Sequence, residues 1–286
     1  MLAPDPSTTE SQLQSAGSTV SPVTEYCQAL RTLVSPYQAY VPASAQQVLH
    51  QSQQDAKSWS GLCQRYTTGL PTAIVQVGNS YLQASGPLQT AADQLSMDPS
   101  DQNALSSLTQ ALSGVQQTLQ EQLDTLHALQ QDVVAFEQKI QQDEQQMTEV
   151  VNSLSGAALS AAQATLSTQF LQSNVLGPCI AIVSINSQIN LQLTTMDAPE
   201  VVGVALLQAL LSQLITLNGH ATQALSAVLD SLSVLNVKYQ AVLSDLAQAT
   251  NDTLPAILQG LELQVSLQAW QQLVDYASGM LTPQQA

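Results

Sequence analysis

The stretch LDTLHALQQDVVAFEQKIQQDEQQMTEVV, Leu123–Val151, places apolar residues at alternating steps of three and four. The same spacing extends back to Leu105, with one polar position in the series at Asp143 or Glu144. Apolar residues at this spacing share one face of an α-helix, and a heptad repeat sustained this far indicates a long helix packed against partners. We therefore predict a helix of about 50 residues, ~75 Å in length.

A second apolar series of the same kind runs from Val201 to Leu246, after a helix-start signal at 197–200 that contains Pro199. Shorter helices are predicted where proline or Asn-Asp-Thr interrupts the pattern: Val23–Val34, Val41–Tyr66, Pro71 to about Leu95, and Leu254 to about Met280. The predicted fold class is all-α, an elongated antiparallel helical bundle with two very long helices and a small apolar head at one end.

The composition of the 286-residue chain agrees with helices and narrows the classes of function. Apolar residues make up 44% and aromatic residues only 4%, which favours helices over strands. The net charge of −16 comes from 21 acidic and 5 basic residues, and the bases are not clustered, which argues against nucleic-acid binding. Residues 1–20 are rich in Ser, Thr and Pro, so we expect them to be disordered. They lack the features of a cleavable signal peptide.

Motifs for catalysis or metal binding are missing from the sequence. His50, His127 and His220 fall in separate predicted helices, without the paired spacing of a zinc site. Neither a phosphate-binding glycine loop nor a nucleophile elbow occurs. Cys27 and Cys63 lack metal-like spacing, and a bridge between them remains open if the chain reaches an oxidising environment. We therefore expect no enzyme activity, no cofactor and no metal.

One segment, Val150–Met196, contains no Asp, Glu, Lys, Arg or His. Gly177-Pro178 marks a turn within it. After the turn, apolar and polar residues alternate from Val183 to Leu193, which is typical of a half-buried strand. A helix stays open, because Ile182, Ile185 and Ile189 also share a helical face. The segment therefore predicts a β-hairpin or a helical hairpin.

These patterns predict three regions. Residues 1–20 form a disordered N-terminus, residues 21–152 and 198–286 form a helical-bundle tail domain, and residues 153–197 form the apolar head. No window of the head is long and apolar enough for a permanent membrane span. The head is either ordinary buried core or a segment that is buried in one state and membrane-facing in another.

This organisation resembles the α-helical pore-forming toxins related to cytolysin A, haemolysin BL and the non-haemolytic enterotoxin. The resemblance rests on several short helices, the long helix Leu123–Val151, the apolar head around Val175–Leu193, and a second long helix from about Pro199. It implies a secreted, water-soluble subunit, exported without a cleaved signal, that inserts its head into the lipid membrane of a target cell. It also implies assembly into a pore as a homo-oligomer and with partner toxin components.

The resemblance and the apolar pattern together assign the membrane-inserting residues. They are Val175, Leu176, Ile180, Ile182, Val183, Ile185, Ile189, Leu191 and Leu193. Turn or hinge positions are expected at Ser155, Gly156, Gly177, Pro178 and Pro199. The apolar tip Val175–Ile185 suits anchoring in one leaflet better than crossing alone, because a bilayer core of about 30 Å needs about 20 helical residues. This favours the membrane-anchoring component of a toxin.

Two other functions fit the same sequence. A helical structural or secretion-associated scaffold would use the uncharged end as a protein interface. A reversible lipid-binding bundle would attach to membranes without forming a pore.

Overall fold

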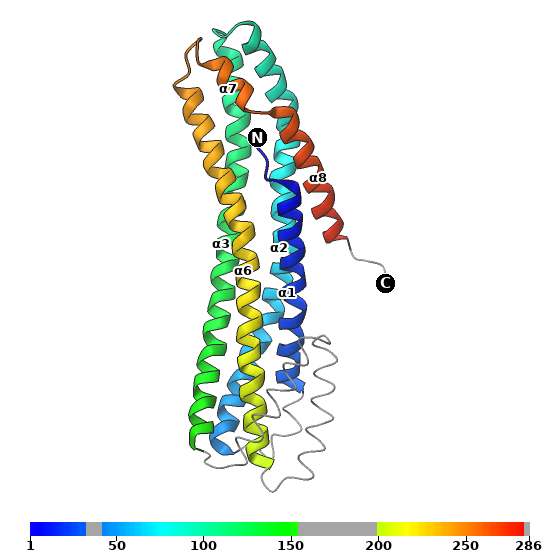
Figure 1. Cartoon of the computed structure of the whole chain (residues 1–286), viewed down its shortest axis with the longest axis vertical. Helices are drawn as coiled ribbons and strands as arrows, with labels where there is room; N and C mark the ends of the chain where they lie inside the picture. Colours follow the sequence, from blue (N-terminus) through cyan, green and yellow to red (C-terminus); the bar gives the residue numbers. More distant parts are fainter. Residues whose placement is uncertain (33–41, 154–198, 283–286) are drawn as a thin grey trace. The chain divides into compact units, whose positions relative to one another are not determined.

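The computed structural model describes residues 1–32, 42–153 and 199–282. This part of the chain is built of helices and contains no strand, so the predicted all-α fold class is confirmed. The helices are α1 (Pro6–Thr32), α2 (Ala43–Met97), α3 (Gln102–Ser153), α6 (Pro199–Ala247), α7 (Leu254–Gly260) and α8 (Leu263–Leu281), as labelled in Figure 1. The hairpin expected after Gly177-Pro178 lies outside the described residues.

The chain divides into two compact units. Unit 1 contains Met1–Gly17, Arg65–Gln130 and Gln223–Ala286, and unit 2 contains Ser18–Gln64 and Gln131–Thr222. Helices α1, α2, α3 and α6 therefore contribute residues to both units, while α7 and α8 belong to unit 1.

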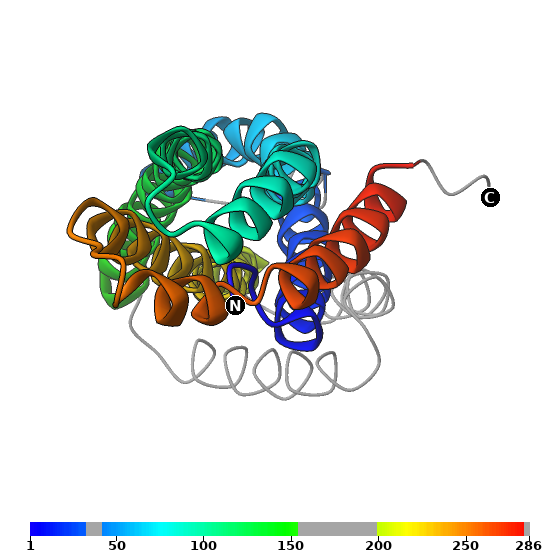
Figure 2. The same ribbon diagram turned by 90° about the horizontal axis from the view of Figure 1, so that it is seen from above.

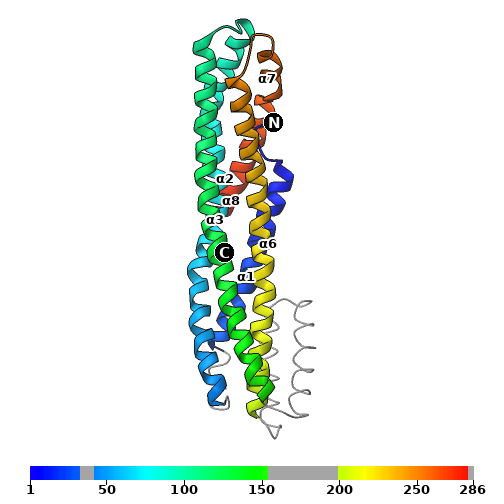
Figure 3. The same cartoon turned by 90° about the vertical axis from the view of Figure 1, so that its left-hand side faces the viewer.

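Helices α3 and α6 pack against each other in antiparallel fashion within each unit (Figure 3). In unit 2, Gln208 donates to Thr148 and Asn218 donates to Glu137, so residue numbers rise along α3 as they fall along α6. In unit 1, Gln130 bonds Ser226 in the same sense. The predicted apolar series is the buried core of α3, including Leu112, Leu119, Leu126, Val133, Phe136, Ile140 and Met147.

The start of α3 is fixed by a side-chain cap. The carboxylate of Asp101 accepts hydrogen bonds from the backbone N–H groups of Asn103 and Ala104, at 2.9 and 3.1 Å. These N–H groups have no partner inside the helix, and a side-chain cap satisfies them. The short segment around Asp98-Pro99 thus separates α2 from α3.

Helix α2 corrects the prediction of a break before Pro71. It is one helix of 55 residues with Pro71 and Pro87 inside it, so the described part of the chain has three very long helices, α2, α3 and α6, where two were predicted. A proline inside a helix costs about 3 kcal/mol, because it removes a hydrogen bond and crowds the preceding turn. Tyr66, Leu70 and Ile74 are fully buried on either side of Pro71, and their burial offsets this cost.

Helix α1 shows that the predicted disorder of residues 1–20 is wrong. The helix begins at Pro6, where Asp5 accepts a hydrogen bond from the N–H of Thr8 at 2.8 Å. Leu13 and Ala16 are buried, although polar residues surround them in the sequence. A helix whose polar side faces solvent needs only a narrow stripe of apolar residues for packing. The low apolar content of residues 1–20 therefore did not exclude a helix.

The C-terminal region is two helices where one was predicted. Between α7 and α8, Glu262 adopts a left-handed backbone conformation with φ of 48°, which ends one helix and redirects the chain into the next. The N–H of Ser266 then bonds the carbonyl of Glu262 at 2.9 Å, at the start of α8.

The N-terminal segment is buried in unit 1 beside α8 (Figure 2). The carbonyl of Leu2 accepts hydrogen bonds from Tyr239 Oη at 3.1 Å and Trp270 Nε1 at 2.9 Å, and its N–H donates to Ser266 Oγ at 2.6 Å. A buried backbone group without partners is costly, and here both polar groups of Leu2 are satisfied. This segment therefore links α6 to α8.

Gly78 allows α8 to approach α2 closely. A Cβ at this position would overlap the side chain of Val274 and lie 3.1 Å from Trp270. Tyr81, one turn further along α2, places its ring 6.4 Å from that of Trp270. Both rings are fully buried, so neither has space to withdraw.

We predict that Gly78→Ala destabilises unit 1 by about 1–3 kcal/mol, because the added methyl overpacks the contact between α2 and α8. Gly114→Ala on α3 is the matched control, since nothing lies within 4 Å of its Cβ position. There the better helix propensity of Ala should stabilise the protein by up to about 1 kcal/mol. Urea unfolding measures both changes, and equal effects of the two substitutions would contradict the packing argument.

Candidate functional site

The predicted apolar head lies almost wholly outside the described residues. This applies to the membrane-inserting residues Val175, Leu176, Ile180, Ile182, Val183, Ile185, Ile189, Leu191 and Leu193, and to Ser155, Gly156, Gly177 and Pro178. Pro199 is the first residue of α6. The candidate site that the structure describes is therefore the part of unit 2 where α3 ends and α6 begins.

At this place the two flanking helices are packed together. Met147 and Val151 of α3 and Val204 and Leu207 of α6 are buried. The amide of Gln208 donates to Thr148 Oγ1 at 3.1 Å, which joins the last turns of α3 to the first turns of α6. Residues 154–198 therefore connect two helix ends that lie close together within unit 2.

A polar layer interrupts the apolar contact between these helices. The side chain of Asn218 is only 1% exposed, and its Nδ2 donates to Glu137 Oε2 at 3.2 Å and to the carbonyl of Val133 at 3.4 Å. Its Oδ1 has no hydrogen-bond partner among the residues that the structure describes. A buried amide of this kind fixes the register of packed helices at a cost in stability.

Asp143 is a second polar residue in the buried face of α3. It occupies the polar position of the apolar series that the sequence assigned to either Asp143 or Glu144. The residue is only 2% exposed, and within the described part of the chain its Oδ2 has no hydrogen-bond partner. Asp55 of α2 faces it and is itself 9% exposed. Asp55 has two stabilising neighbours, because Gln51 Nε2 donates to it at 2.6 Å and Lys139 Nζ lies 3.8 Å from its Oδ1.

Burial, and then the nearby charge of Asp55, raise the pKa of Asp143 from 3.8 to about 7, while a hydrogen bond with Ser52 acts in the opposite direction. The folded state therefore holds this proton more tightly than the unfolded state does. It follows that the stability of the fold decreases as the pH rises from about 4 to about 7. Above that range the penalty reaches about 4 kcal/mol.

Cys27 and Cys63 lie on α1 and α2 in unit 2 and are not joined by a disulfide bond. Burial, and then the proximity of Cys63, raise the pKa of the Cys27 thiol well above its usual range. Thr24 Oγ1 lies 3.5 Å from the sulfur of Cys63. Both cysteines therefore sit in the packed contact between α1 and α2, as small buried or half-buried side chains.

The described residues contain neither a cluster of metal-binding side chains nor a membrane-spanning helix. Across residues 1–32, 42–153 and 199–282, no three residues of the metal-binding types gather closely enough to hold an ion. None of the helices in this part of the chain has an apolar stretch of the length that a membrane span requires.

No protein-family model matches the sequence, and no curated protein matches it either. Solved structures do match. The HblL1 toxin component of Bacillus cereus has 11% identity and a TM-score of 0.64, over 99% of this chain and 98% of that chain. Motility associated killing factor B of Vibrio cholerae has 12% identity and a TM-score of 0.65, over 99% of this chain and 94% of that chain.

A third match is the soluble AhlB of the tripartite α-pore-forming toxin of Aeromonas hydrophila, with 11% identity and a TM-score of 0.62. It covers 95% of this chain and 94% of that chain. The chain therefore has the fold of α-pore-forming toxin components along nearly its whole length, and the resemblance inferred from the sequence is confirmed at the level of the fold.

We predict that Asp143→Asn stabilises the protein most at alkaline pH, because the amide keeps a partner for Ser52 and cannot ionise. The difference in unfolding free energy between variant and parent should shrink by about 3 kcal/mol from pH 8 to pH 5. Urea unfolding at both pH values measures it. Asp124→Asn, at an exposed position of the same helix, is the control for the loss of one negative charge and should change the unfolding free energy little. A pH-independent effect of Asp143→Asn would contradict the assignment.

Proposed function

We infer that this protein is a subunit of a multi-component α-pore-forming toxin. In its water-soluble form, residues 153–197 are covered. At a target membrane this apolar head is released, inserts into the lipid, and the subunit assembles with further copies and with partner components into a pore. The observation that carries the proposal is an uncharged segment placed between the adjacent ends of two antiparallel helices, in a fold shared with toxin components.

The extent of the structural likeness supports this function over a generic helical bundle. The match to the HblL1 toxin component includes 99% of this chain and 98% of that chain, so the likeness extends over nearly the full length of both chains. Fold alone does not define function, and the second support must therefore come from the residues of the segment itself.

The segment has the composition that conditional membrane insertion requires. A charge at the bilayer centre costs at least about 2.5 kcal/mol, and Val150–Met196 contains none. The helices on both sides carry acidic residues close to the segment, such as Glu144 and Glu149 on α3. The absence of charge is therefore confined to the part that would enter the membrane.

The interior of unit 2 is also suited to a change of state. Asp143 and Asn218 each leave a buried oxygen without a partner, in the contacts of α3 with α2 and α6. Each unsatisfied buried polar group costs about 1–3 kcal/mol. These groups weaken the packed form of unit 2, which lowers the free energy needed to rearrange its helices.

Partner components are proposed from the same comparison. AhlB is described as part of a tripartite toxin. By analogy, the present chain would require companion subunits for a complete pore and would anchor in one leaflet without them.

Liposome flotation tests the insertion step. Ile182→Asp combined with Ile185→Asp places two charges in the head, and we expect the double variant to lose nearly all membrane binding, because each charge must leave water. Val234→Asp combined with Val237→Asp is the matched control. These valines are 58% and 63% exposed in unit 1, and two acids there should leave flotation unchanged.

Dye release from the same vesicles separates the remaining alternatives. Release that requires the protein together with companion subunits supports a multi-component pore. Binding without release under every combination would instead indicate a reversible lipid-binding bundle. Equal flotation of parent and head variant, or no flotation of the parent, would contradict the proposal and favour a scaffold whose uncharged end binds protein.

A further inference from the structure

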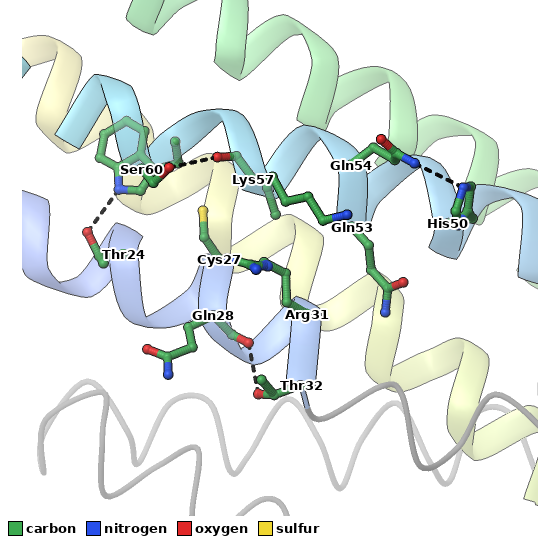
Figure 4. A pocket seen from close by; sticks show the side chains of 12 residues that line it. Thr24, Cys27, Gln28, Arg31, Thr32, His50, Gln53, Gln54, Lys57 and Ser60 are labelled. Carbon is green, nitrogen blue, oxygen red and sulfur yellow. Dashed lines mark hydrogen bonds between the residues drawn. The ribbon is translucent and has the colours of Figure 1, made fainter. Parts of the chain in front are cut away.

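A cavity between α1 and α2 in unit 2 has an unusual charge for this protein. Its volume is about 450 Å³, and it lies beside the last turn of α1 (Figure 4). Arg31 enters from α1 and Lys57 from α2, so two of the five basic side chains of a chain with net charge −16 line one cavity. No Asp or Glu lines it.

Neither base is neutralised by an acid within the described residues, where no ion pair of Arg31 or Lys57 is found. The sequence also limits what the rest of the chain can supply. Of the residues outside the described part, 33–41, 154–196 and 283–286 contain no Asp or Glu, which leaves Asp197 and the undescribed side chain of Glu200 as the remaining acids. Arg31 lies in the last turn of α1, where the helix dipole stabilises a positive charge. The dipole of α1 does not explain the second base, Lys57, on the opposite wall of the cavity.

The walls of the cavity are held in place. Trp59 Nε1 donates to Thr24 Oγ1 at 2.9 Å, and Thr24 Oγ1 in turn donates to the carbonyl of Val20 at 2.9 Å. On the side nearer the end of α1, Gln53 Nε2 donates to the carbonyl of Leu30 at 3.3 Å. These bonds fix the spacing of α1 and α2 on both sides of the two bases, so the site is formed before any ligand arrives.

The lining offers both anion recognition and an apolar surface. The guanidinium of Arg31 suits bidentate contact with phosphate oxygens, and the ammonium of Lys57 adds a point charge. Trp59 and Ala56 are buried residues that supply an apolar wall. A volume of this size is within the range of small-molecule sites and exceeds what one inorganic phosphate fills.

We propose that this cavity binds the phosphate of a phospholipid headgroup, with Arg31 and Lys57 on the phosphate oxygens and the glycerol portion against Trp59. That the phosphate belongs to a lipid rests on the proposed function. The net charge of −16 opposes adsorption of the whole protein to an anionic surface, so recognition acts through one headgroup in a local basic site. It thus provides a first contact with lipid that is distinct from the apolar head.

Calorimetric titration with a short-chain phosphatidylglycerol, held below its critical micelle concentration, tests the site without any membrane. The parent should bind it, and Arg31→Gln combined with Lys57→Gln should weaken binding at least tenfold, because two charge-assisted contacts are lost. Both side chains are exposed, so the fold should be unaffected, which thermal unfolding checks. Single variants Lys57→Gln and Lys238→Gln remove the same charge inside and outside the cavity, and only the first should weaken binding.

Inorganic phosphate is titrated in parallel to distinguish the two sources of the anion. Binding of the lipid at least tenfold tighter than phosphate supports the proposal. Equal affinity for both would overturn the lipid assignment, and unchanged binding by the double variant, or no binding by the parent, would overturn the site. The dissolved lipid requires no membrane insertion, so the titration tests the headgroup site and flotation tests the apolar head. Either test can fail while the other succeeds.

Discussion

The antiparallel contact between α3 and α6 is the constraint on which the rest of the structure depends. Its apolar series buries leucines and valines in both units, and hydrogen bonds such as Thr148–Gln208 and Gln116–Asn236 set the register. Because the side chains that form these bonds are unevenly spaced, a slide by one heptad would place polar groups opposite apolar ones. The ends of the helices that enter the uncharged segment are therefore held at defined positions.

The long helices were predictable because their signal is periodic and extends over many turns. Positions such as Leu112, Leu119 and Leu126 each support the same face, so no single residue decides the outcome. The continuity of α2 was not predictable in this way. Pro71 argues locally for a break, and only the burial of Tyr66 and Ile74 against other helices, which the sequence does not reveal, outweighs it.

The sequence predicted some features of the candidate site and missed others. The heptad series showed a polar position at Asp143 or Glu144 but gave no sign that it is buried; only the structure places Asp143 in the core and opposite Asp55, 88 positions earlier. The helix in residues 6–20 and the basic cavity were both missed. Few apolar residues define that helix, and Arg31 and Lys57 are distant in sequence, so their proximity depends on how α1 packs on α2. The head residues themselves remain predictions.

The buried carboxyl pair has a consequence for how the protein responds to its surroundings. Protonation of Asp143 relieves the repulsion from Asp55, so a mildly acidic medium tightens the packing of α2 and α3 in unit 2, and a neutral one loosens it. A mildly acidic compartment would accordingly strengthen the contact between α2 and α3 in unit 2. Conditions at the outer surface of a cell would weaken it, which is the reverse of an acid-triggered device.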